Sequence, residues 1–160
     1  MKLVNEIVKE MLEKHTGGEK FFDNLDKSLQ NTDIVEHFVA SIVSGYEAGG
    51  FDKVIVSGKF GIFLNNYLRY SDQAGLPFDC IMVRGGLRHD YMDGELEYLR
   101  DAINNKRFVF VDDSFYSGHT RDAIKREVER CAGQIVSSYV VYDGSKDKDD
   151  TVYSLYRYYK

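Results

Sequence analysis

The chain has 160 residues, of which 43% are hydrophobic and 29% charged, and this balance is typical of one globular domain. Its 21 Lys and Arg residues are outnumbered by 26 Asp and Glu residues, for a formal net charge of −5. This balance excludes a protein that binds nucleic acid or an anionic membrane through excess basic charge. The net charge is still compatible with binding of a small phosphorylated ligand, because a few well-placed groups are enough to bind it.

The cysteines and histidines exclude two further classes of protein. Two cysteines, Cys80 and Cys131, are too few for a disulfide framework, and each lies beside apolar sequence. We expect both to be buried, reduced thiols of a cytoplasmic protein. The four histidines lack metal-ligand spacing, so no zinc site is expected.

The N-terminal part of the chain is predicted to be helical. Apolar residues at helical spacing predict one amphipathic helix over 2–14, with lysines and glutamates on its other side. A second helix is predicted to begin at Asp33, which can cap it, and to end at Gly49 and Gly50.

The remainder of the chain alternates between strands and helices. Short apolar segments predict strands over 53–57, 78–83, 107–111 and 135–142. Helices are predicted between them, over 61–70, 95–104 and 121–131. The acidic turn 143–150 leads to a tyrosine-rich tail that alternates like an edge strand. The fold class is therefore α/β, with a mainly parallel, Rossmann-like twisted sheet flanked by helices.

In such sheets, ligands bind at the carboxyl ends of the strands. Three loops are predicted there: 57–61, 84–94 and 112–120. We therefore expect the chemistry of this chain to lie in these loops.

The strongest motif is FVFVDDSFYSGHT, residues 108–120. It places Asp112 and Asp113 at the end of a buried strand, where they can accept hydrogen bonds from vicinal hydroxyls or attract a divalent cation. The loop after them leads into a helix, whose first N–H groups favour a phosphate. Gly118 lets the backbone approach such a ligand closely. One loop thus offers sites for a phosphate and a sugar diol.

Three other interpretations of this segment were considered. The receiver domains of response regulators also end a strand in an acidic pair, but at their first strand, whereas only residues 114–160 follow here. A Walker-B-like strand would need a G-x-x-x-x-G-K-[ST] loop, which the sequence lacks. The third interpretation is a capped turn with two solvated carboxylates.

The segment resembles the 5-phosphoribosyl diphosphate (PRPP) motif of type I phosphoribosyltransferases. The resemblance implies that family's fold, with a small variable hood over the base. It also implies that Asp112 and Asp113 hold the ribose hydroxyls, and that they hold Mg²⁺ either directly or only through ribose hydroxyls or water. The loop that would cradle the 5′-phosphate comprises Ser114, Phe115, Tyr116, Ser117, Gly118, His119 and Thr120.

Two upstream segments extend the resemblance. Ser57, Gly58 and Lys59 fall where the family carries its pyrophosphate-binding loop, although a plain turn with a solvated lysine is the alternative. The loop that contains Arg84 and Arg88 resembles the mobile catalytic loop of orotate phosphoribosyltransferases; the alternative is an ordinary exposed loop. Arginines there can bind phosphate oxygens in a bidentate manner.

The resemblance implies transfer of the phosphoribosyl group from PRPP to a nitrogenous base, orotate or another pyrimidine, with release of pyrophosphate and Mg²⁺ as cofactor. Asp112, Asp113 and Arg88 would be the catalytic residues, and Arg84 a pyrophosphate ligand. Tyr116 replaces an acid of the purine-salvage members, which disfavours hypoxanthine or guanine, and His119 stands where glycine is common.

We expect a cytoplasmic homodimer built from one domain, divided into a helical or hood region (1–35), an α/β core (36–142) and a C-terminal edge strand or hood (143–160). A regulator that binds PRPP or a nucleotide without turnover is the alternative function. A phosphatase or hydrolase on a related sheet is a third possibility, opposed by the lack of a nucleophile.

Overall fold

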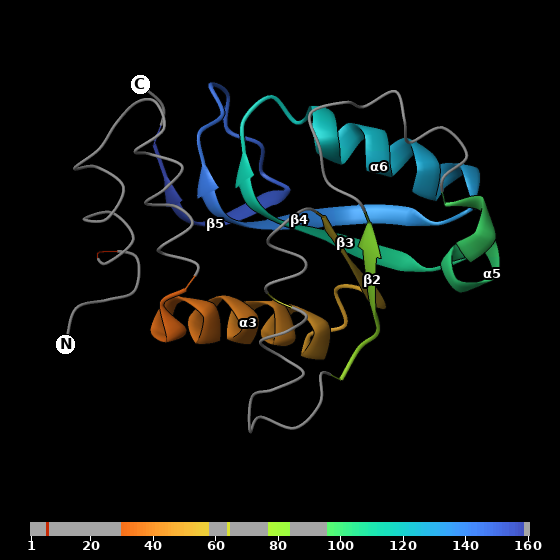
Figure 1. Cartoon of the computed structure of the whole chain (residues 1–160), viewed down its shortest axis with the longest axis horizontal. Helices are drawn as coiled ribbons and strands as arrows, with labels where there is room; N and C mark the ends of the chain where they lie inside the picture. The colour runs from red at the N-terminus through yellow and green to blue at the C-terminus, as the bar shows by residue number, and fades with distance from the viewer. Residues whose placement is uncertain (1–5, 7–29, 58–63, 65–76, 84–95, 159–160) are drawn as a thin grey trace.

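A computed structural model describes residues 6, 30–57, 64, 77–83 and 96–158 of the chain (Figure 1). Apart from Glu6 and Leu64, the helices predicted over 2–14 and 61–70 lie outside these ranges. The predicted lid 84–94 lies outside them as well.

The described residues form one five-stranded sheet in which every neighbouring pair is parallel. Its strands are β1 (Lys53–Ser57), β2 (Cys80–Val83), β3 (Arg107–Phe115), β4 (Gln134–Asp143) and β5 (Val152–Arg157). Their order across the sheet is β2-β1-β3-β4-β5. The predicted parallel sheet and the predicted edge strand in the tail are confirmed.

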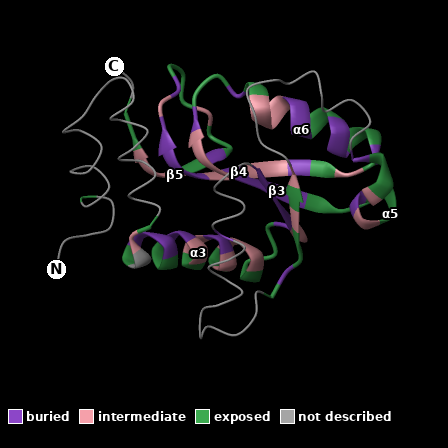
Figure 2. Cartoon of the chain, viewed as in Figure 1, coloured by how far each residue is buried: buried purple, intermediate pink, exposed green. Residues whose placement is uncertain are grey.

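Helices cover both faces of this sheet (Figure 1). Helix α3 (Thr32–Glu47) lies on one face, and the short helices η2 (Glu97–Leu99) and α5 (Arg100–Ile103) lie with α6 (His119–Arg130) on the other. In Figure 2 the buried residues of α3 and α6 face the sheet, as their amphipathic spacing requires. Among the residues described, no helix is long and apolar enough to cross a membrane.

The N-cap of α3 differs from the prediction. Asn31 Oδ1 accepts hydrogen bonds from the backbone N–H groups of Asp33 and Ile34, at 3.0 and 3.3 Å. The helix therefore begins at Thr32, and Asp33 lies in its first turn rather than at the cap. A first-turn carboxylate still interacts favourably with the helix dipole.

Alternation along β3 divides the core into two layers. Val109 and Val111 pack with α3 on one face, and Phe108 and Phe110 pack with α5 and α6 on the other. All four side chains are at most 1% exposed. Burial on both faces explains why β3 has a continuous apolar run instead of an alternating pattern.

The structure corrects two predicted boundaries near the acidic pair. β3 does not end at Val111 but continues to Phe115, because β4 runs alongside it and pairs Ser114 with Tyr142. Helix α6 begins at His119, two residues before the predicted start. The loop between them is therefore reduced to residues 116–118.

The cysteines also differ from each other. Cys131 is a buried free thiol, as expected. Cys80 is free but exposed, because it begins β2, which is an edge strand of the sheet. The prediction that both thiols are buried was therefore wrong for Cys80.

The turn between α6 and β4 supplies a stability prediction. A Cβ atom on Gly133 would lie 2.6 Å from Ile103 Cγ2 and 2.9 Å from both the Ile103 carbonyl oxygen and Val128 Cγ1. We expect Gly133→Ala to lower the free energy of unfolding by about 1–3 kcal/mol, measured by urea denaturation. Gln134→Ala, an exposed neighbour, should change it by less than about 0.5 kcal/mol. Equal effects of the two changes would contradict this packing argument.

Candidate active site

The carboxylate pair lies where the chain reverses its direction across the sheet. From β1 the chain moves outward to β2 and then returns to the other side of β1 as β3, so β1 and β3 flank the topological switch point. Ser57, at the end of β1, donates a hydrogen bond from Oγ to Asp112 Oδ2 at 3.1 Å. This bond spans the switch point, where open α/β sheets bind their ligands.

Asp112 has an unusual protonation equilibrium. Burial and the charge of Asp113 raise the pKa of the Asp112 carboxyl to about 8, although hydrogen bonds from the Asp113 N–H and from Ser57 oppose the rise. The ligand-free carboxyl therefore keeps its proton to a higher pH than an ordinary aspartate does. A ligand that donates hydrogen bonds to it would favour the ionised form. Perturbed carboxyls of this kind are common at functional sites.

Asp113 is oriented by its neighbour in β3. Ser114 Oγ donates a hydrogen bond to Asp113 Oδ1 at 3.0 Å. Ser114 lies in β3 and supports the acidic pair, and its predicted role in the phosphate loop stays a prediction. The structure thus brings Ser57, Asp112, Asp113 and Ser114 into one hydrogen-bonded cluster.

The short loop after β3 leads directly into the N-terminus of α6. Gly118 is the N-cap of α6 and has a left-handed backbone with φ +81°. A Cβ there would lie 3.2 Å from the Phe115 ring, so glycine suits both the backbone and the packing. Ser117 Oγ accepts from the His119 N–H at 3.4 Å, and His119 and Thr120 open the helix. The N–H groups in the first turn of a helix have no intrahelical partner, and this end of a helix favours a phosphate.

Phe115, which was predicted to belong to the phosphate loop, is the last residue of β3. Its side chain is only 6% exposed, and the Arg121 guanidinium lies 4.9 Å from its ring centroid. The buried Phe115 ring therefore fixes the start of the loop 116–118 to the core. Sequence reasoning did not single out Arg121, although an arginine directly after the Ser-Gly-His-Thr segment was a visible signal.

Tyr116 presents an aromatic surface beside the acidic pair. Its side chain is 42% exposed, and its ring centroid lies 5.9 Å from that of Tyr142. Burial of the hydroxyl, with Tyr142 and the charge of Asp113, raises the pKa of Tyr116, so the phenol stays neutral. A Cβ on Gly144 would lie 2.6 Å from the Tyr116 ring. Sequence reasoning missed Gly144, whose only signal was its position after a strand.

The other predicted loops leave from the same edge of the sheet. Ser57 pairs in register with Val83, the last residue of β2. The loops that begin at Gly58 and at Arg84 therefore start near the acidic pair. Gly58, Lys59, Arg84 and Arg88 themselves lie outside the described residues, so their pyrophosphate and lid roles stay predictions.

The acidic pair suits a metal ion that binds together with a phosphorylated substrate. Within the described ranges, no group of three or more His, Cys, Asp or Glu side chains could hold a metal ion. Mg²⁺ is usually bound through one or two carboxylates together with substrate phosphates and water. Asp112 and Asp113 satisfy that modest requirement, directly or through ligand hydroxyls.

Comparison with known proteins identifies the fold. No family model matches the sequence. The chain is 24% identical over 150 residues to an adenine phosphoribosyltransferase of Thermosipho africanus, covering 84% of this chain and 87% of that protein. It is similar to the crystal structure of an adenine phosphoribosyltransferase from Thermoanaerobacter pseudethanolicus, with a TM-score of 0.62 and 20% identity over 96% of this chain and 99% of that chain. The orotate phosphoribosyltransferase of Mycobacterium tuberculosis is also similar, with a TM-score of 0.57 and 12% identity over 97% of each chain.

The chain therefore has the fold of the type I phosphoribosyltransferases, as the resemblance implied. The similar proteins are enzymes of the pentosyltransferase class. Their names include both a purine and a pyrimidine acceptor, so the fold alone does not select the base.

Proposed function

We propose that this chain is a phosphoribosyltransferase that transfers the 5-phosphoribosyl group of PRPP to a nitrogenous base and releases pyrophosphate. One observation carries the proposal: the acidic pair at the β1/β3 switch point and the glycine-capped start of α6 are one short loop apart. Hydroxyl-accepting and phosphate-binding groups therefore lie side by side, as a phosphorylated ribose requires.

In this proposal, acidic and basic residues bind different parts of PRPP. Asp112 and Asp113 accept hydrogen bonds from the ribose hydroxyls, and the backbone N–H groups of residues 116–118 and of the first turn of α6 bind the 5′-phosphate. Lys59, Arg84 and Arg88 stabilise the negative charge of the departing pyrophosphate. Mg²⁺, bound with PRPP beside the acidic pair, supplies further positive charge for the leaving group.

We propose a purine, with adenine first, as the acceptor. The relative found by sequence and one structural neighbour are both adenine phosphoribosyltransferases, whereas the orotate enzyme shares 12% identity. Tyr116 replaces the acid that the resemblance would lead one to expect in members acting on hypoxanthine or guanine. Its neutral, half-exposed ring suits stacking against an aromatic base.

A screen of bases tests this function. The protein is incubated with Mg²⁺, PRPP and one of adenine, hypoxanthine, orotate, uracil or nicotinate, and pyrophosphate release is measured. We expect the highest rate with adenine. PRPP binding without release for any base would support the PRPP-sensing regulator instead, and a highest rate with orotate would overturn the purine assignment alone.

Tyr116 gives a sharper test of base recognition. Stacking of a base on an aromatic ring contributes about 1–3 kcal/mol, so Tyr116→Ala should raise the KM for the base by about 10-fold or more. Tyr116→Phe keeps the ring and should stay within about 2-fold of the wild type. The Kd for PRPP, measured by calorimetry, should be nearly unchanged in both. An unaltered base KM in Tyr116→Ala would exclude the stacking role.

A further inference from the structure

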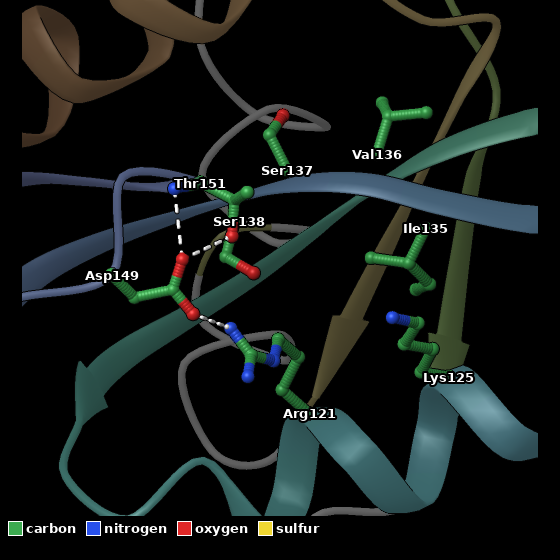
Figure 3. A pocket seen from close by; sticks show the side chains of 8 residues that line it. All are labelled: Arg121, Lys125, Ile135, Val136, Ser137, Ser138, Asp149 and Thr151. Carbon is green, nitrogen blue, oxygen red and sulfur yellow. Dashed lines mark hydrogen bonds and ion pairs between the residues drawn. The ribbon is translucent and has the colours of Figure 1, made fainter.

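A polar hollow lies on the α6 face of the sheet. It has a volume of about 220 Å³ and lies between α6, β4 and the connection from β4 to β5 (Figure 3). Its polar lining comes from all three elements: Arg121, Lys125, Ser137, Ser138, Asp149 and Thr151. The acidic pair is not part of this lining, whereas Arg121 lies in the first turn of α6, which follows the proposed phosphate loop.

Ser138 is the anomaly that points to a ligand. This side chain is 0% exposed, and its hydroxyl has no hydrogen-bond partner in the described part of the chain. On the same face of the sheet, Ile135 and Val140 belong to apolar core clusters, so Ser138 lies between two apolar residues of this face. A buried hydroxyl without a partner costs about 1–3 kcal/mol, which a ligand that hydrogen-bonds to it would recover.

Lys125 supplies the charge for such a ligand. Figure 3 shows its side chain extending from α6 into the space between Ile135 and Arg121. No salt bridge involves Lys125 within the described ranges. An ammonium group without a carboxylate partner, directed into a hollow with a buried hydroxyl, favours an anionic occupant.

The rest of the wall is held in place by its own interactions. Arg121 donates to Asp149 Oδ2 at 2.6 Å and is paired with Asp122 at 3.1 Å. Burial opposes ionisation of Asp149, but hydrogen bonds from Thr151 and Arg121 outweigh it and lower the pKa of Asp149 to about 2. The guanidinium of Arg121 is therefore already used by two carboxylates, and Lys125 is the cation of the lining that forms no salt bridge with a described residue.

We propose that this hollow binds a small oxyanion, the phosphate group of a small molecule, through the ammonium of Lys125 and the hydroxyl of Ser138. Its volume is below the usual range of about 300–1,000 Å³ for drug-sized ligands, which limits the occupant to a compact phosphorylated molecule. The proposal does not depend on phosphoribosyl transfer.

The test is a titration of the whole protein with inorganic phosphate, followed by backbone amide chemical shifts. Phosphate can also bind at the start of α6, so the two sites are separated by residue. We expect saturable shifts at Lys125 and Ser138, with a Kd on the order of 1 mM or tighter. Shifts confined to residues 117–120 would overturn the proposal.

A matched pair of variants excludes a general charge effect. Lys125→Gln and Arg126→Gln each remove one positive charge from exposed positions of α6, and Arg126 is not part of the hollow. We expect Lys125→Gln to raise the phosphate Kd at Ser138 by about 10-fold and Arg126→Gln to leave it nearly unchanged. Equal weakening in both variants would show that only net charge matters and would refute the site.

Ser138→Ala adds a readout of stability. Without phosphate it should unfold at a higher urea concentration than the wild type, because the unpartnered hydroxyl is gone. With saturating phosphate this advantage should shrink, because only the wild type gains a hydrogen bond. If the gain in stability of Ser138→Ala is the same with and without phosphate, Ser138 does not bind phosphate and the proposal is refuted.

Discussion

Replacing Asp112 and Asp113 together by asparagine is expected to reduce the rate of pyrophosphate release by at least about 100-fold. Each hydrogen bond to a charged acceptor contributes about 1.5–3 kcal/mol, and the double variant weakens two of them. Asparagine keeps the shape of both side chains, so the fold should persist. The measurements are the initial rate, which should fall, and the Kd for PRPP, which should rise.

A control variant with the same change of charge makes this result specific. Asp147 and Asp150 are exposed residues of the connection between β4 and β5. Their joint replacement by asparagine should alter the rate by less than about 2-fold, because surface charges of this kind interact weakly. A loss as large as that of the acidic-pair variant would show that net charge, and not the pair, controls the reaction.

The second large effect concerns stability and pH. The raised pKa means that folded Asp112 holds a proton between about pH 4 and pH 8, whereas the unfolded chain has released it at the ordinary pKa of 3.8. Because the native state binds more protons in this window, the free energy of unfolding falls as the pH rises. Asp112→Asn cannot ionise and should remove this part of the dependence.

We therefore expect ligand-free Asp112→Asn to be more stable than the wild type at pH 8, by about 1–3 kcal/mol, and similar to it near pH 4. Urea denaturation at several pH values, with chelator present, measures the difference. An unchanged pH dependence in the variant would assign the slope to other groups. Greater stability with less activity is the usual relation at a functional site.

The parts of the fold that depend on burial could be predicted from the sequence. The strand over 53–57 was predicted with its observed bounds, because burial on both faces produces an uninterrupted apolar run. The end of β3 could not be predicted in this way. Asp112 to Ser114 are polar, and they belong to the strand only because β4 pairs with them, which is a tertiary property.

In the candidate site, too, features within one short segment could be predicted and features that depend on strand pairing could not. The spacing of Asp112, Asp113 and Gly118 was visible in the sequence, since these residues lie within one short segment. The hydrogen bond from Ser57 to Asp112 was not visible, because it depends on β1 and β3 being neighbours. The burial of Ser138 was hidden for a similar reason, since a serine within a strand gives no signal of the hollow beneath α6.

A calorimetric titration of the wild-type protein with PRPP and Mg²⁺ tests the central claim most directly. If the acidic pair and the start of α6 form a phosphoribosyl site, PRPP binds saturably at one site per chain with a Kd in the micromolar range. The titration is done at two temperatures, so that a binding enthalpy near zero at one of them does not hide the reaction. The absence of saturable heat at both temperatures would contradict the assignment of this site to PRPP.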